Sequence, residues 1–190
     1  MRETRGTLLL VDEAGVSLTP LIARTWAPRG YAPKIAYNFN WKSISAIGGV
    51  DPDGEMHFRL HEGSIKKEQV IDYLGQLLRH VQGHIVILWD GLPAHRATAV
   101  KEFAELHGDR LSVYRLPAYC PDFNPMEWLW AEVKWNRLKG YCPKDLSELR
   151  KKLVSVIGGL RRKPDLIRSY FDASTLPIKP QDVRKLCRHQ

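Results

Sequence analysis

The chain has 190 residues, of which 44% are hydrophobic, enough for one domain with a buried core and not typical of a disordered chain. Its longest apolar stretches, TLLLV and IVILW, are far too short for a membrane span, and acids break the apolar run in MRETRGTLLLVDEAG, which argues against a signal peptide. We therefore expect a cytosolic protein with no membrane partner.

Positive charge is concentrated in the C-terminal third. Residues 134–190 contain 15 Lys plus Arg and 5 Asp plus Glu, whereas residues 1–133 contain 14 and 16. This asymmetry favours a polyanionic partner, with nucleic acid before acidic lipid, although a lysine-rich solvated helix would give the same counts. The runs RRKPD and VRKLCRH contain no aromatic residues, which indicates contact with phosphates and not stacking on bases.

The N-terminal half predicts three strands. Residues 7–13, TLLLVDE, are a short apolar run typical of a buried strand, and 14–20 continue as a loop or a weaker strand. SISAIGGV and EMHFRLH predict a hairpin, because apolar and polar residues alternate in the second run and residues 51–54 supply turn chemistry. Residues 22–41, rich in Pro and Gly, stay unassigned.

Helices and strands alternate in the second half. An amphipathic helix over 66–83 precedes a buried strand, HIVILWDG, and then a helix over 97–108 and a strand over 111–116. A helix from Pro125 to about residue 139 and another from Asp145 follow. The expected buried positions on these helices are Val70, Ile71, Leu74, Leu77, Leu78, Val81, Val100, Phe103, Ala104, Met126, Leu129, Trp130, Val133, Leu146, Leu149, Leu153, Val156 and Leu160.

This order of elements predicts an α/β sandwich around a mixed sheet whose later strands are parallel. Asp12 and Asp90 each end a buried strand, so the two carboxylates share one sheet edge if the strands are parallel neighbours. Each Asp alone is more typical of a turn or a helix cap. Close together, however, they repel each other unless a cation lies between them, and carboxylate oxygens suit Mg²⁺ or Mn²⁺.

A third carboxylate, Glu127, lies in the first turn of the helix that begins at Pro125. Asn124 suits the N-cap, and a Glu three residues later can accept a hydrogen bond from a free backbone N–H, so capping and metal binding compete for Glu127. Asp122 is the alternative third acid, although a turn suits it better. Three carboxylates can hold two divalent ions, the arrangement that supports phosphodiester cleavage.

Three segments, LLLVDEAG, VILWDGLPAHR and YRLPAYCPDFNPMEWLWAEVK, together resemble the catalytic domain of DDE transposases, in the mariner-related insertion sequence 630 family. The resemblance covers roughly residues 7–140, and 36 residues, 91–126, separate Asp90 from Glu127, a spacing compatible with that family. It implies a ribonuclease H-like mixed five-stranded sheet with helices on both faces. We therefore expect a catalytic domain over residues 1–140 and a basic C-terminal helical extension over 141–190.

The resemblance implies that Asp12, Asp90 and Glu127 are the catalytic acids and bind two Mg²⁺ ions, for which Mn²⁺ can substitute. Glu13 should face away from Asp12, because side chains alternate along a strand. The expected DNA-contacting residues are His95, Arg96, Lys134 and Arg137. For His95 a hydrogen bond at a helix start, and for Lys134 a solvated surface position, explain the residue equally well.

The implied activity is DNA strand cleavage and strand transfer, in a cut-and-paste reaction at a TA target, by an enzyme that is a dimer when active. Its partners would be transposon ends and target DNA. The first predicted strand begins only a few residues after Met1, so we expect a separately encoded half to supply the helix-turn-helix that reads the ends, or a truncated copy that lacks it. A ribonuclease H-like nuclease or resolvase without joining activity, and an inactive DNA-binding remnant, are the alternatives.

Overall fold

A five-stranded mixed sheet forms the centre of the protein in a computed structural model that describes residues 6–22, 26–35, 37, 40–117 and 120–176. The strands are β1 Thr7–Ser17, β2 Ser43–Val50, β3 Met56–Glu62, β4 Ile85–Trp89 and β5 Leu111–Arg115. Their order is β3-β2-β1-β4-β5; the β1–β2 and β2–β3 pairs are antiparallel, and the β1–β4 and β4–β5 pairs are parallel. The predicted mixed sheet is therefore confirmed.

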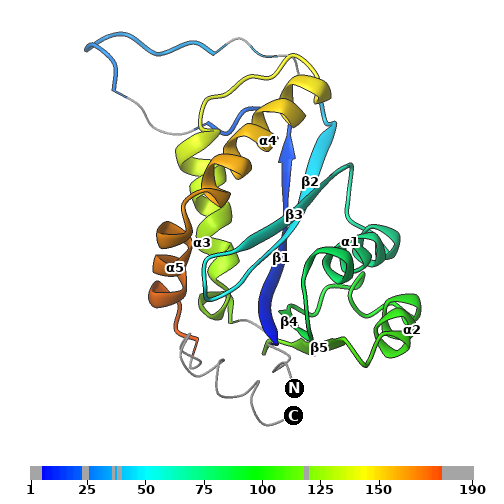
Figure 1. Ribbon diagram of the computed structural model, residues 1–190. Coiled ribbons are helices and arrows are strands. Elements are labelled where there is room, and N and C mark those ends of the chain that lie inside the picture. The colour runs from blue at the N-terminus through cyan, green and yellow to red at the C-terminus, as the bar shows by residue number, and fades with distance from the viewer. Residues whose placement is uncertain (1–5, 23–25, 36, 38–39, 118–119, 177–190) are drawn as a thin grey trace.

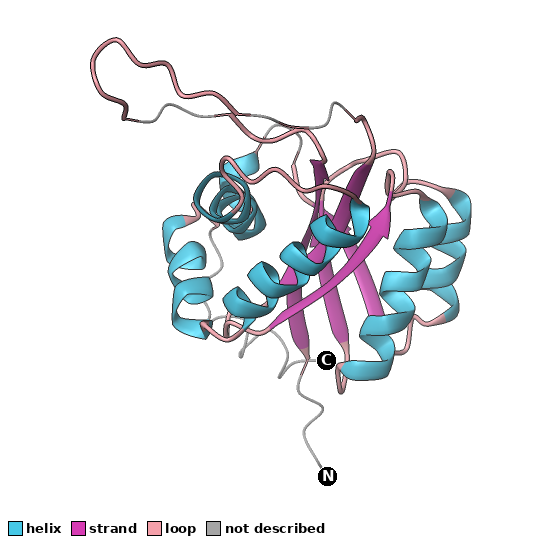
Figure 2. Cartoon of the chain, turned by 90° about the horizontal axis from the view of Figure 1, so that it is seen from above, coloured by secondary structure: helices cyan, strands magenta, loops and turns pink. Residues whose placement is uncertain are grey.

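Helices cover both faces of this sheet (Figures 1 and 2). They are α1 Lys67–His80, α2 Thr98–Leu106, α3 Pro125–Ala131, α4 Leu146–Arg161 and α5 Pro164–Ala173. A short 3₁₀-helix, Pro121–Phe123, precedes α3, and a π-helix, Glu132–Arg137, continues it. The pair α1 and α2 lies on one face, and α3, α4 and α5 lie on the other. Among the described residues, no helix has the length and apolar character of a membrane span.

Alternation along β1 divides the core into two clusters. Leu8 and Leu10 pack among the residues of α3, α4 and α5, whereas Leu9 and Val11 pack among those of α1 and α2. The same alternation continues to the end of the buried run. It directs Asp12 toward the α3 side of the sheet and Glu13 toward the α1 side. The prediction that Glu13 faces away from Asp12 is confirmed by its contact with His95, described below.

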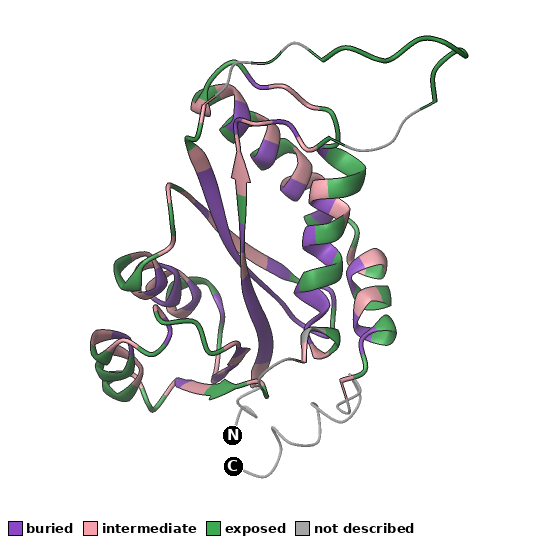
Figure 3. Ribbon diagram, turned by 180° about the vertical axis from the view of Figure 1, so that it is seen from behind, coloured by how far each residue is buried: buried purple, intermediate pink, exposed green. Residues whose placement is uncertain are grey.

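The C-terminal helices belong to this core. Leu153 and Ile157 of α4 and Phe171 of α5 are buried in the same cluster as Leu10 of β1. Figure 3 shows the buried positions on the sides of these helices that face the sheet. The helices α4 and α5 therefore cover an apolar sheet face that would otherwise be exposed, and the boundary at residue 140 stays a prediction. The run VRKLCRH lies outside the described residues.

A π-helical turn explains how the α3 segment ends. Val133 is buried, and the next buried residue is Leu138, whose N–H donates to the Val133 carbonyl at 3.0 Å. This five-residue step adds one residue to the ordinary helical repeat. Arg137, which an uninterrupted α-helix would direct toward the core, consequently stays on the surface and pairs with Glu132. The predicted helix from Pro125 is thus present, with an unpredicted π turn.

Candidate active site

The ends of β1 and β4 bring two acids to one edge of the sheet. These strands run parallel, with Leu10 paired to Leu88 as the last aligned pair, so Asp12 and Asp90 occupy equivalent places two residues further on. Asp12 is buried, with 9% of its surface exposed, whereas the Asp90 side chain is 44% exposed. The prediction that these two residues share a sheet edge is therefore confirmed.

Asn124 fixes the start of α3 to β1. Its Oδ1 accepts a hydrogen bond from the Met126 N–H at 3.1 Å, and its Nδ2 donates to the Val11 carbonyl at 3.2 Å, next to Asp12. Asn124 is buried and caps the helix without help from Glu127. The Glu127 side chain is exposed and has no hydrogen bond or ion pair with another described residue. Glu127 is therefore available for another role.

Replacement of Asn124 with Ala is expected to lower the free energy of unfolding by about 2 to 3 kcal/mol, because the helix loses its cap and the Val11 carbonyl loses its donor. Urea denaturation measures this loss. Asn136→Ala is the matched control, since Asn136 is exposed and its side chain bonds only Glu132 among the described residues. A change of about 0.5 kcal/mol or less is expected there. Equal effects of the two substitutions would contradict the role given to Asn124.

The electrostatics of Asp12 show that the acids interact. Burial and the negative charges of Glu127, Glu13 and Asp90 raise the pKa of Asp12 to about 8, although a hydrogen bond from the Glu13 backbone N–H acts in the opposite direction. Among the charges, that of Glu127 has the largest effect on the pKa of Asp12. No described Lys or Arg forms an ion pair with any of the three acids, Asp12, Asp90 and Glu127. His95 pairs with Asp90, whereas Asp12 and Glu127 have no cationic partner among the described residues.

Such a donor set fits a hard divalent cation. Carboxylate oxygens are the ligands that Mg²⁺ and Mn²⁺ prefer, and a cation would relieve the repulsion that raises the Asp12 pKa. The ligand atoms of the three predicted acids do not, however, all lie within 4.8 Å of one another. Of the described residues, one group has three potential ligand atoms all within 4.8 Å of one another, and it consists of Glu13, Asp90 and His95.

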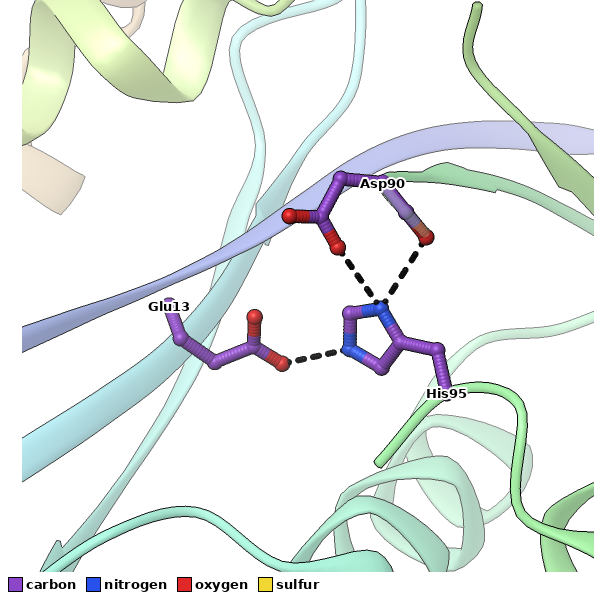
Figure 4. Close-up of side chains that lie close together, drawn as sticks. All are labelled: Glu13, Asp90 and His95. Atoms are coloured by element: carbon purple, nitrogen blue, oxygen red, sulfur yellow. Dashed lines mark hydrogen bonds and ion pairs between the residues drawn. The ribbon is translucent and has the colours of Figure 1, made fainter. Parts of the chain in front are cut away.

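That second group is a hydrogen-bonded network (Figure 4). His95 Nε2 lies 2.7 Å from Glu13 Oε1, and Nδ1 lies 2.9 Å from Asp90 Oδ1 and 3.2 Å from the Asp90 carbonyl oxygen. The imidazole stacks on Trp89, with ring centroids 4.2 Å apart. Both nitrogens point at acids and leave no lone pair directed at an ion, so the group is not itself a metal site.

Burial of His95 settles one of the sequence predictions. Its side chain is fully buried, which by itself lowers the pKa of the imidazole, but the hydrogen bond that it donates to Glu13 and the charges of Glu13 and Asp90 outweigh burial and raise it. A fully buried side chain offers no surface to a phosphate, which corrects the predicted DNA contact of His95. The alternative explanation of His95, a hydrogen bond near the start of a helix, agrees with its contact with Asp90 shortly before α2.

The other predicted DNA-contacting residues lie at or near the surface. Arg96 is exposed and Lys134 is half-buried, whereas exposed Arg137 is paired with Glu132, Nε to Oε1 at 2.7 Å. These contacts stay predictions. Asp122, the alternative third acid, is exposed on the 3₁₀-helix, and its carbonyl accepts a hydrogen bond from the Thr175 N–H at 3.0 Å. Its charge is not among the main causes of the raised pKa of Asp12.

Comparison with known proteins identifies the family. The family described as DDE superfamily endonuclease matches residues 7–171 of this chain. The chain belongs to this family. No curated protein matches it. The match extends through α4 and most of α5, which agrees with the packing of both helices on the sheet of this DDE endonuclease.

Several solved structures resemble this DDE endonuclease. A Mos1 transposase paired-end complex with left transposon end has 20% sequence identity and a TM-score of 0.65, over 98% of this chain and 55% of that chain. A mariner Mos1 paired end complex with Mg has 19% sequence identity and a TM-score of 0.66, over 96% of this chain and 54% of that chain. The catalytic domain of Mos1 mariner transposase has 18% sequence identity and a TM-score of 0.60, over 98% of this chain and 82% of that chain.

At these identities the likeness establishes the fold. The strand order, the strand directions and the match to these structures confirm the predicted ribonuclease H-like fold. The DDE endonuclease spans about half the length of the Mos1 chains in the paired-end complexes.

Proposed function

We propose that this DDE endonuclease is a transposase catalytic domain that cleaves DNA strands and joins them to a target, with Asp12, Asp90 and Glu127 as its metal-binding catalytic acids. The observation that carries the proposal is geometric: Asp12 and Asp90 end the parallel neighbours β1 and β4, and Asn124 anchors to β1 the helix whose first turn contains Glu127. The raised pKa of Asp12, about 8, agrees with it. A buried carboxylate held among other acids without a Lys or Arg partner is costly unless a cation compensates it.

The three acids would divide the work according to their exposure. Asp12 is the most buried and interacts with both others, so it is the candidate to bridge two ions. Asp90 and Glu127 are more exposed, so their carboxylates would be accessible to DNA-bound ions. Two divalent ions, when bound, would activate the attacking oxygen and neutralise charge on the leaving oxygen. Water would cleave a phosphodiester first, and the freed 3′ hydroxyl would then displace a 3′ oxygen in the target strand.

The proposed partners are transposon ends and target DNA. Exposed Arg96, half-buried Lys134 and Arg137 are the candidate phosphate contacts, supported by the excess of 15 basic over 5 acidic residues in 134–190. The similar Mos1 structures are named as paired-end and strand transfer complexes. From the sequence resemblance to mariner-related transposases, we propose that two copies act together and that a separately encoded helix-turn-helix half reads the DNA ends.

A strand-transfer assay tests the proposal. The full chain is incubated with labelled duplex DNA and Mg²⁺ or Mn²⁺, with EDTA as the control, and the products are separated on a denaturing gel. Joined products are expected, with binding that weakens steeply as salt is raised. Cleavage without joining would instead indicate a nuclease, and binding without either reaction would indicate an inactive remnant.

A further inference from the structure

We propose that His95 is a positioning residue that holds the Asp90 carboxylate in its metal-binding orientation. Glu13, whose side chain lies on the sheet face opposite to that of Asp12, orients His95. This inference rests on the proposed function, because it assigns a task to two residues behind the proposed catalytic acids. Neither residue would touch the metal or the DNA. Both would act through Asp90.

The two oxygens of Asp90 are treated differently. Oδ1 faces two donors, the Leu92 N–H at 3.0 Å and His95 Nδ1 at 2.9 Å. Oδ2 has no hydrogen-bond partner among the described residues, and Figure 4 shows it pointing away from the imidazole. A carboxylate anchored through one oxygen cannot rotate freely, although its side chain is 44% exposed at the end of β4. The second oxygen is thereby presented in a fixed direction.

His95 is itself fixed by three contacts. Glu13 Oε1 lies 2.7 Å from Nε2, the Asp90 carbonyl oxygen lies 3.2 Å from Nδ1, and Trp89 stacks on the ring with an interplanar angle of 4°. The imidazole therefore has no alternative orientation available without loss of these contacts. Since Glu13 comes from β1 and Asp90 follows β4, the network also ties together the two strands that carry the proposed acids.

Stability alone does not account for this arrangement. Glu13 is mostly buried, and its Oε2 has no hydrogen-bond partner in the part of the chain described. Burial of a charged group with an unsatisfied oxygen is costly, and apolar residues in place of buried ion pairs are often neutral or stabilising. An arrangement that costs stability beside a proposed metal ligand is better explained by the orientation that it imposes.

Mn²⁺ binding to the full chain, measured by electron paramagnetic resonance of the free ion, tests the proposal. The amide nitrogen of Asn can take the place of His Nδ1, and that of Gln can take the place of Nε2. His95→Gln therefore loses the donor to Asp90 and is expected to raise the Kd for Mn²⁺ by about 10- to 100-fold. His95→Asn keeps that donor and is expected to raise it less. If His95 had a purely structural role, the larger rise in Kd would not be expected for the variant that loses the donor to Asp90.

His84→Gln is the matched control. His84 also contacts two groups through its ring, the Asp109 carbonyl and Ser112 Oγ, but at the opposite end of β4. Mn²⁺ affinity should be unchanged there. Thermal unfolding in EDTA identifies any variant that does not fold. If both His95 variants fail to fold, Glu13→Gln decides: a weaker but measurable loss of Mn²⁺ affinity supports the proposal, and wild-type affinity overturns it.

Asp90→Asn separates this inference from the proposed function. Wild-type Mn²⁺ affinity in Asp90→Asn would overturn the assignment of the catalytic acids. A loss in Asp90→Asn together with wild-type affinity in His95→Gln would overturn only the positioning role. Equal losses in His95→Asn and His95→Gln would also overturn it, because the donor to Asp90 would then be irrelevant.

Discussion

Asp90→Asn is expected to reduce metal-dependent DNA cleavage by about 1,000-fold or more while salt-dependent DNA binding stays nearly intact. The amide has the shape of the carboxylate, and its oxygen can still accept the hydrogen bonds that Leu92 and His95 give to Asp90. It has no negative charge, however, with which to bind a divalent cation. Cleavage is measured with labelled duplex DNA, and binding is measured by fluorescence anisotropy at several salt concentrations.

Asp122→Asn is the control for this experiment. Asp122 lies close in sequence to Glu127, but it is exposed and is not among the main causes of the raised pKa of Asp12. Its substitution should leave cleavage at the wild-type rate. Cleavage that survives in Asp90→Asn would disprove the assignment of Asp90. Loss of cleavage in Asp122→Asn would instead favour Asp122 over Glu127 as the third acid.

The metal-free protein is expected to lose stability as the pH rises from about 4 to about 8. The pKa of Asp12 is raised from 3.8 to about 8, so between these values the folded state binds a proton that the unfolded state has released. Unfolding is thereby disfavoured at low pH, and this contribution is lost as the pH approaches the folded pKa. The slope for one proton is at most about 1.4 kcal/mol per pH unit.

Urea denaturation in EDTA at several pH values measures this dependence. Asp12→Asn should flatten the slope and make the metal-free protein more stable than the wild type at pH 8, because a neutral amide removes the repulsion among the acids. At that pH, Mn²⁺ should stabilise the wild type and not the variant. A wild-type slope in Asp12→Asn would contradict the role of Asp12.

Asp51→Asn is the matched control for the pH experiment. Burial raises the pKa of Asp51 to about 6, with smaller effects from the turn around it. Asp51 therefore contributes to the slope in the same direction, but only up to about pH 6. Above that pH, Asp51→Asn should follow the wild type, whereas Asp12→Asn should not.

Periodicity and strand-end acids predicted most of the fold and the acids of the candidate site. The parallel pairing of β1 and β4 follows from two buried apolar runs, so the place of Asp12 beside Asp90 was accessible from the sequence. Glu127 was accessible because Asn124 and Pro125 mark a helix start. Alternation also showed that Glu13 faces away from Asp12.

Contacts between distant residues were not accessible in this way. The meeting of Glu13 with His95, 82 positions later in the chain, depends on how the turn after β4 folds back over the sheet, which no local pattern encodes. The one signal was a Glu directly after Asp12 combined with a His soon after Asp90. Helix α5 was predicted only as part of a basic helical extension, because no local pattern showed that Ile167 and Phe171 would be buried against the sheet.

The π turn at Glu132–Arg137 separates the two ends of its helix. Glu127 lies before it, and Leu138 anchors the chain behind it. Removal of one residue from the turn would restore an ordinary α-helical step from Val133 to Leu138, without rotation of the first turn or loss of the anchor. The segment can thus absorb an insertion or a deletion. Relatives could differ in length here and still keep the glutamate in register with the strand ends.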